Sequence, residues 1–246
     1  MKLSLLLFSG AMFCASASAI DFDGVLKSGQ GLMKAATLSD SDVKELTDRA
    51  CVEMDSKARV ASSGDKYATR LSTVMQGMPA SIKGQPVNYK VYLTKSVNAW
   101  AMANGCVRVY SGLMDMMNDD ELRGVIGHEE GHVALGHTRK AMQTAYATSA
   151  ARDAAGAAGG TVATMSQSQL GELAEKFVNA QFSQSQESEA DNYSFDLLTE
   201  NKLNREGLVT SFQKLAKLDG GKSSMLSSHP SSAERAANMQ KRIDQK

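Results

Sequence analysis

One stretch of six residues decides the fold: Gly127-His128-Glu129-Glu130-Gly131-His132. It contains the pattern His-Glu-x-x-His, and another histidine, His137, follows closely behind. On a helix, His128 and His132 are four residues apart and project from one face within about 6 Å of each other. Two imidazoles on one face can bind one zinc ion, and Glu129 beside them is a candidate general base. The alternative is a charged helix with a solvated face.

The residues before this stretch predict the helix. Asn118, Asp119 and Asp120 offer an N-cap and first-turn acids, which suit the unpaired N–H groups and the positive end of the helix dipole. Apolar residues then recur at spacings of three, four and seven, as on a helix face that packs against a core. These residues are Leu122, Val125, Ile126 and Val133. Glu130 is turned about 100° from Glu129 around the axis, and we expect no chemical role for it.

Residues 1–19 have the features of a secretory signal peptide. A positively charged start is followed by an apolar run up to Cys14, and Ala17-x-Ala19 fits a signal-peptidase site. The run is too short to span a bilayer. A lipoprotein anchor at Cys14 is the alternative, which we favour less because Phe13 stands where a bacterial lipoprotein has a small residue.

The chain after position 19 has the composition of one soluble domain. Removal of the signal takes one lysine and no acid, which leaves 26 basic and 27 acidic residues. This balance gives no reason to expect nucleic acid or an anionic membrane as a partner. No later stretch approaches 18 uninterrupted apolar residues, and the length suits a single core. We expect one domain over 20–246 in the periplasm, with a helical lead over about 20–80 and at most peripheral association with the envelope.

Two cysteines, Cys51 and Cys106, remain after the signal. An isolated pair in an oxidising compartment can form a disulfide. Two buried free thiols are the alternative, and we favour the bond.

Capping and turn residues predict helices on both sides of a short segment of strands. One helix begins at Ser39, where Asp42 completes a capping-box-like start, and runs towards position 58. Later patterns predict helices over 65–75, 170–178, 187–198, 208–218 and 232–243, with a loop at 156–160. Residues 87–93, 97–103 and 106–110 are candidate strands, and Asn104-Gly105 is a strong hairpin turn. An exposed edge of this sheet could bind an extended peptide through main-chain hydrogen bonds; an ordinary half-buried hairpin is the alternative.

A hydrolytic zinc site needs a third protein ligand and an open position for water. His137 lies nine residues beyond His128, about half a turn off its helical face, so we expect it to cap or pack instead. Glu187 and Asp191 are four apart and share a face, so one carboxylate could bind the metal while the other accepts a hydrogen bond from the free N–H of a ligating histidine. Such a pair is usually part of a solvated face, and it gains weight only from the two histidines.

These motifs resemble a known family. His128-Glu129-x-x-His132, a downstream Glu187-x-x-Ala190-Asp191 and a late His229-Pro230 followed by Arg235 are similar to the HtpX and CAAX-prenyl-protease type of zinc metallopeptidase. Residues 85–92 and 98–105 resemble its secreted bacterial branch, and the resemblance covers essentially the whole mature chain.

The resemblance implies an α+β, mainly α-helical, zincin-like (gluzincin) domain with a small antiparallel sheet beside the His128 helix. It implies one Zn²⁺ per chain, with Glu187 as the third ligand and Asp191 as the partner of a ligating histidine. It also implies that His229 and Arg235 belong to the active site. The substrate-binding edge strand that it implies consists of Asn98, Ala99, Trp100, Ala101 and Met102.

The expected activity is metal-assisted peptide hydrolysis on unfolded polypeptides of the envelope, including outer-membrane proteins. Glu129 would take the proton of the attacking water, and His229 is our first choice as donor to the oxyanion. His229 could instead be a fourth ligand in a resting state. Two other classes remain open: a chaperone-like factor that binds peptides in the same groove with little turnover, and an iron oxygenase, which also uses two histidines and a carboxylate but usually on a β scaffold.

Overall fold

The computed structural model describes residues 38–154, 165–218, 225, 228–229 and 232–245. The predicted signal peptide, the part of the predicted lead before position 38 and the loop at 156–160 lie outside these residues. Within them, no helix combines the length and the apolar composition needed to cross a bilayer.

The first helices begin at the predicted caps. In α3 (Asp40–Lys57) Ser39 and Asp42 exchange hydrogen bonds as a capping box. In α4 (Lys66–Val74) the carboxylate of Asp65 accepts from the backbone N–H of Tyr67. Both helices agree with their predicted ranges to within one or two residues.

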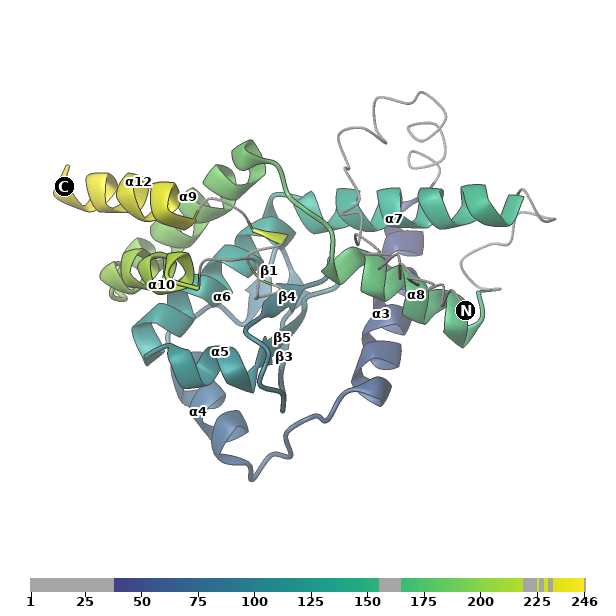
Figure 1. Ribbon diagram of the computed structural model, residues 1–246, viewed down its shortest axis with the longest axis horizontal. Helices are drawn as coiled ribbons and strands as arrows, with labels where there is room; N and C mark the ends of the chain where they lie inside the picture. The colour runs from purple at the N-terminus through teal and green to yellow at the C-terminus, as the bar shows by residue number, and fades with distance from the viewer. Residues whose placement is uncertain (1–37, 155–164, 219–224, 226–227, 230–231, 246) are drawn as a thin grey trace, which may run out of the picture.

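A three-stranded sheet lies at the centre of the fold (Figure 1). It consists of β3 (Asn88–Tyr92), β4 (Ala99–Ala101) and β5 (Cys106–Tyr110), in the spatial order β3-β5-β4. The hairpin turn at Asn104-Gly105 joins β4 and β5 as predicted, with φ of 82° at Gly105. The prediction of an antiparallel sheet is wrong for β3, which pairs parallel to β5. Residues 93–98 carry the chain past β5, so β4 begins on its far side.

A second, two-stranded hairpin was not predicted. It pairs β1 (Ser81–Ile82) with β2 (Gln85–Pro86), and the two turn residues, Lys83 and Gly84, both have positive φ. This conformation is typical of a two-residue hairpin loop, but a lysine at its first position gives little sequence signal.

The two faces of the main sheet support two separate cores. Val91, Val107 and Val109 point into a core formed with α4, α6, α9 and α10, whereas Tyr92 and Trp100 point into a core formed with α3, α7 and α8. The side chains alternate because successive residues of a strand face opposite sides. The sheet therefore joins two groups of helices, which lie on opposite sides of it in Figure 1.

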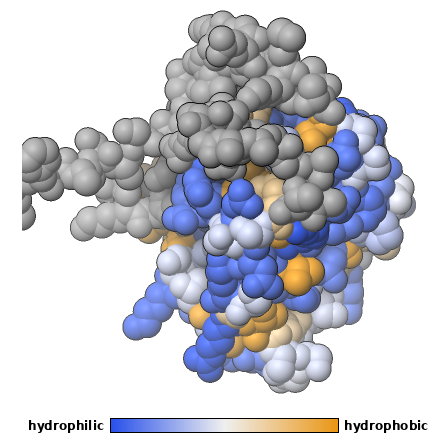
Figure 2. Space-filling view, turned by 90° about the vertical axis from the view of Figure 1, so that its right-hand side faces the viewer, coloured by the Kyte–Doolittle hydropathy of each residue, from blue (hydrophilic) through white to orange (hydrophobic). Residues whose placement is uncertain are grey.

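The remaining helices form these two groups. Their bounds are α5 Ser111–Met116, α6 Asp119–Ala134, α7 His137–Ala154, α8 Gln167–Val178, α9 Gln184–Glu200, α10 Glu206–Ala216 and α12 Ser232–Asp244. Asn118 and Glu121 form a capping box that starts α6, the helix with the His-Glu-x-x-His pattern. α6 lies centrally and packs against α9 and α10 on one side and against β4 on the other. On the face drawn in Figure 2, the described surface is mostly hydrophilic, with small separate hydrophobic patches.

The predicted edge strand is shorter and more enclosed than expected. The strand assigned to β4 is Ala99–Ala101, backbone hydrogen bonds to β5 continue at Asn98 and Met102, and Asn98, Trp100 and Met102 are almost completely buried. β4 is an edge strand of the sheet, but its residues are buried in this conformation, so the binding of an extended peptide there stays a prediction. Both faces of β4 contribute to a core, and α6 packs against it.

Glycines let α6 approach its neighbours closely. A Cβ added at Gly124 would lie 2.8 Å from Cα of Leu208 in α10, and one at Gly131 would lie 2.9 Å from the carbonyl oxygen of Ala190 in α9. Backbone atoms cannot move aside as a flexible side chain can. The distance between these helices is therefore set by the absence of side chains on one face of α6.

A buried ion pair joins α3 to the sheet. Arg108 of β5 is 1% exposed, and its guanidinium donates to both carboxylate oxygens of Asp55 at 2.7 and 2.9 Å. Its remaining N–H groups donate to the carbonyls of Asn88 and Val107 and to Sγ of Cys51. Cys51 and Cys106 are joined by a disulfide between α3 and β5, at a Cα–Cα distance of 6.5 Å.

We expect Gly124→Ala to destabilise the protein. Replacement of glycine by alanine inside a helix normally stabilises a protein by about 1 kcal/mol. Overpacking against backbone atoms typically destabilises it by about 1–3 kcal/mol. Urea unfolding should show a net loss of up to about 2 kcal/mol. Gly64→Ala is the control, because nothing lies within 4 Å of the added Cβ. A gain in stability for Gly124→Ala would contradict the packing described above.

We expect Asp55→Asn to cost about 3–5 kcal/mol at pH 7, because it leaves the Arg108 charge buried without a counter-charge. Burial alone would raise the pKa of Asp55, but hydrogen bonds from Arg108 and two neighbours lower it to about 2. The stability from a depressed carboxyl pKa is present above the unfolded value of 3.8 and lost as pH falls towards 2. Unfolding measured from pH 7 to 2.5 should show that the difference in stability between wild type and Asp55→Asn shrinks below pH 4. The control is Asp196→Asn, which removes an exposed partner of Arg242 and should change the stability little.

Candidate metal centre

Four buried side chains converge between α6, α9 and the segment before α12. They are His128, His132, Glu187 and His229, and one nitrogen or oxygen of each lies within 4.8 Å of the others. Nε2 of His128 is 3.1 Å from Nε2 of His132 and 3.2 Å from Nδ1 of His229. Oε1 of Glu187 is 2.9 Å from Nδ1 of His229 and 3.2 Å from Nε2 of His132. Each of the four residues is at most 4% exposed.

Local structure explains how each residue reaches this place. His128 and His132 are on one face of α6, as the spacing predicts. Glu187 is in the first turn of α9, which begins at a capping box formed by Ser183 and Gln186. The positive end of the helix dipole there favours an ionised carboxylate. His229 lies just before α12, and its backbone N–H donates to the carbonyl of Met225 at 2.8 Å.

Asp191 and Arg235 lie directly behind the cluster. The Arg235 guanidinium donates to both oxygens of Asp191, at 2.6 and 2.8 Å, and also lies 2.6 Å from Oε2 of Glu187. Nδ1 of His128 is 2.8 Å from Oδ1 of Asp191, so a proton on that nitrogen leaves Nε2 free to bind a metal. Phe212 covers the guanidinium, 4.1 Å from its ring centroid.

Glu129 and Glu130 are both buried, and they face different partners. Oε1 of Glu129 forms no hydrogen bond with the described residues, and Nε2 of His229 lies 3.5 Å from it. Glu130 accepts a hydrogen bond from the hydroxyl of Tyr89, and burial raises its pKa to about 7. The structure thus turns only Glu129 towards the converging side chains. The burial of Glu130 was not predicted, because its neighbour comes from β3.

The electrostatics of the cluster favour a cation. Burial raises the pKa of Glu129. Burial would also raise the pKa of Glu187, but His229, His128 and Arg235 hold it well below its usual value. Burial lowers the pKa of the His132 imidazole well below its usual range. The pKa values of both Glu187 and Asp191 are lowered, so two ionised carboxylates face the one guanidinium of Arg235, and a cation bound beside them would offset the excess negative charge.

The donor set fits a divalent metal of the zinc type. Nitrogen of imidazole and oxygen of carboxylate are ordinary zinc ligands, and a hydrolytic site uses three of them with a further position for water. His128, His132 and Glu187 provide two nitrogen donors and one oxygen donor in a buried site. His229 offers a fourth nitrogen in the same space.

His137 is outside this group, although it is buried at the start of α7. Its Nδ1 lies 3.0 Å from Nδ1 of His132, and its Nε2 lies 3.1 Å from Oε2 of Glu189. Phe182 stacks on the His132 ring at a centroid distance of 3.9 Å. Sequence patterns did not single out Phe182 or the contact between the two histidines.

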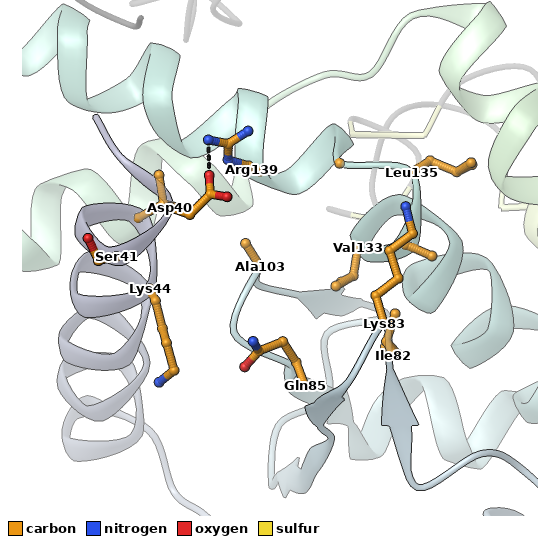
Figure 3. Close-up of a pocket in the computed structure, with 13 residues that line it drawn as sticks. Asp40, Ser41, Lys44, Ile82, Lys83, Gln85, Ala103, Val133, Leu135 and Arg139 are labelled. Atoms are coloured by element: carbon orange, nitrogen blue, oxygen red, sulfur yellow. Dashed lines mark ion pairs between the residues drawn. The ribbon is translucent and has the colours of Figure 1, made fainter. Parts of the chain in front are cut away.

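A separate pocket lies beyond the C-terminal end of α6 (Figure 3). Its volume is about 550 Å³, and its walls come from the start of α3, the β1–β2 hairpin and the α6–α7 junction. Arg139 and Asp40 form an ion pair across it, shown by the dashed line in Figure 3. Val133, next to His132, lines this pocket, but none of the four converging side chains does.

Comparisons with known proteins agree with this arrangement. The sequence model of peptidase family M48 matches residues 65–243, which include all four converging residues. Metalloprotease LoiP of Escherichia coli (strain K12) is 58% identical over 225 residues, or 91% of this chain and 89% of LoiP. Metalloprotease YcaL of the same organism is 54% identical over 231 residues, or 94% of this chain and 91% of YcaL.

The family match spans well over half of the chain, and both relatives cover nearly all of it. Such a family implies a divalent metal, and the structure offers buried donors for one. The chain therefore belongs to peptidase family M48 and is a metalloprotease.

Proposed function

We propose that the protein is a zinc endopeptidase that cuts extended or misfolded polypeptides of the cell envelope. The observation that carries the proposal is the buried convergence of two α6 histidines with the Glu187 carboxylate, beside a second carboxylate, Glu129. His128, His132 and Glu187 are the proposed ligands. A zinc ion held there would polarise the scissile carbonyl and lower the pKa of a water molecule.

Glu129 is the proposed general base. It follows His128 directly on α6, and its Oε1 faces Nε2 of His229 at 3.5 Å, whereas Glu130 faces Tyr89. Burial raises its pKa, which suits a group that takes a proton from water and then delivers it to the leaving amine. None of the described residues forms a hydrogen bond to Oε1, which leaves that oxygen available for the water.

We propose two roles for His229, first as a fourth donor in the resting state and then as a hydrogen-bond donor to the oxyanion. In this conformation its Nδ1 lies among the proposed ligands, where it would be a fourth donor and close the position that water needs. Rotation of the imidazole away from His128 and Glu187 would leave that place to a water molecule. The ring is then placed to donate to the oxyanion while Arg235 keeps Glu187 ionised.

The substrate class follows from the strand next to α6. By the alternation of an antiparallel ladder, the peptide groups of Ala99 and Ala101 face away from β5 and are suited to pair with an extended chain. Residues 98–102 are buried here, so substrate pairing requires the edge to open. Extended or misfolded chains, including those of outer-membrane proteins, offer the free main chain that this pairing needs.

The periplasm is the proposed location. Residues 1–19 have the pattern of a cleavable signal peptide, and the Cys51–Cys106 disulfide suits an oxidising compartment. The proposed mature protein is one metallopeptidase domain over 20–246.

We expect Glu129→Gln to lower casein cleavage by about 10²–10⁴-fold, because the base is lost while the ligands remain. Metal analysis of protein purified without added metal should still find one zinc per chain. Glu130→Gln is the matched control: it changes the adjacent buried carboxylate, and Tyr89 can still donate to the amide oxygen. Unchanged cleavage by Glu129→Gln, or iron in place of zinc, would refute the mechanism. Prevention of aggregation that persists in Glu129→Gln while wild type shows no cleavage would favour a chaperone-like binder.

We expect His229→Ala to lower kcat by about 10²–10³-fold, the typical effect of losing one oxyanion donor. Zinc content should stay at one per chain, because three ligands remain. KM and kcat for a fluorogenic peptide should separate binding from chemistry, with the larger change in kcat. A rise in kcat would show instead that His229 only inhibits.

A further inference from the structure

The mechanism above leaves His137 without a role, yet its position is well defined. It is 7% exposed and lies between two charged or polar neighbours, His132 at 3.0 Å and Glu189 at 3.1 Å. The other oxygen of Glu189 accepts from the hydroxyl of Ser185 at 3.1 Å. His132, His137 and Glu189 therefore form a hydrogen-bonded chain that runs outward from the proposed metal centre.

The direction of the protons along this chain is determined by its outer end. A carboxylate only accepts, so Nε2 of His137 carries a proton and donates to Glu189. In the neutral imidazole, Nδ1 of His137 is then an acceptor, and it can receive a hydrogen bond from Nδ1 of His132. A proton on Nδ1 of His132 leaves the lone pair on Nε2, the atom that faces His128 and Glu187. This is the tautomer that a metal ligand needs.

Nδ1 of each α6 histidine faces an acceptor, but the acceptor differs between His128 and His132. Nδ1 of His128 faces the carboxylate of Asp191 directly. Among the described residues, Nδ1 of His132 has no carboxylate beside it, and the nearest acceptor is Nδ1 of His137. Phe182 stacks on the His132 ring at an interplanar angle of 22° and limits its tilt. The hydrogen bond and the stacking together leave His132 one orientation.

A break in the helix makes this contact possible. Gly136 has φ of 79°, a left-handed conformation that ends α6, and the N–H groups of Leu135 and Gly136 return to carbonyls of the last turn. In a continuous helix, a residue five positions beyond His132 would lie about 140° around the axis. The turn at Gly136 redirects the chain so that His137 begins α7 and faces back towards His132.

We propose that His137 is a positioning residue for the metal centre: it presents an acceptor to His132 and holds the lone pair of His132 towards the ion. With a metal bound to Nε2 of His132, that nitrogen would carry no proton, so Nδ1 would carry it and donate to Nδ1 of His137, which Glu189 holds in the accepting form. The inference rests on the proposed zinc site, with His132 as a ligand.

The test compares two substitutions of equal shape. Asn places Oδ1 where His137 has Nδ1 and still accepts a hydrogen bond, whereas Leu fills similar space and cannot accept. We expect His137→Leu to bind Zn²⁺ about 10–100-fold more weakly than wild type, as measured by competition with a chromogenic chelator. His137→Asn should stay within about threefold of wild type. Thermal unfolding of both apo-proteins checks that each is folded.

A second pair of variants covers the case in which His137→Leu does not fold. Glu189 is half exposed, so neither Glu189→Gln nor Glu189→Leu threatens the core. Gln keeps an acceptor for His137 and Leu does not, so only Glu189→Leu should weaken zinc binding, by a few-fold because water replaces part of the contact.

The outcomes separate this inference from the proposed function. If wild type binds no zinc, the proposed function fails. If wild type binds zinc and the Leu and Asn variants at position 137 bind it equally, the positioning role is overturned and His137 only packs. Weakening in the Leu variants, with recovery in Asn and Gln, supports the inference.

Discussion

The close packing of α6 against α9 and α10 is the constraint on which the rest of the structure depends. Gly124, Gly127 and Gly131 give α6 a face without side chains, and atoms of the other two helices occupy that face. At this separation the first turn of α9 lies beside the C-terminal half of α6. Glu187 therefore reaches His128 and His132, although 55 residues separate it from His132 in the chain.

The same packing removes the site from water, and most of its buried charges have close partners. Asp191 accepts two hydrogen bonds from Arg235 and faces His128, while Glu187 faces Arg235 and His229. Such pairing offsets the cost of burying charge. Glu129 departs from this pattern, because one of its oxygens forms no hydrogen bond with the described residues. Departures of this kind concentrate at functional sites, where a reacting molecule uses the group.

Helix boundaries were predictable because capping is local. Ser39 with Asp42, and Asn118 ahead of α6, act within a few residues of the helix that they start. The sheet was predicted less well, since β3 pairs with β5 rather than with the next strand along the chain, and only the β4–β5 turn has a clear sequence pattern. The burial of Glu130 was missed because its partner, Tyr89, comes from β3.

The sequence by itself determined which residues can carry the chemistry: two histidines and a carboxylate at helical spacing, and a helix start before them. That much follows because positions within one or two turns of a helix have nearly fixed relative geometry. The tertiary structure alone decided which downstream groups meet these residues. Helix separation and the turn at Gly136 bring Glu187, His229 and His137 to different sides of the α6 histidines. Contacts between elements depend on packing and chain reversal, which have no counterpart in a local pattern of residues.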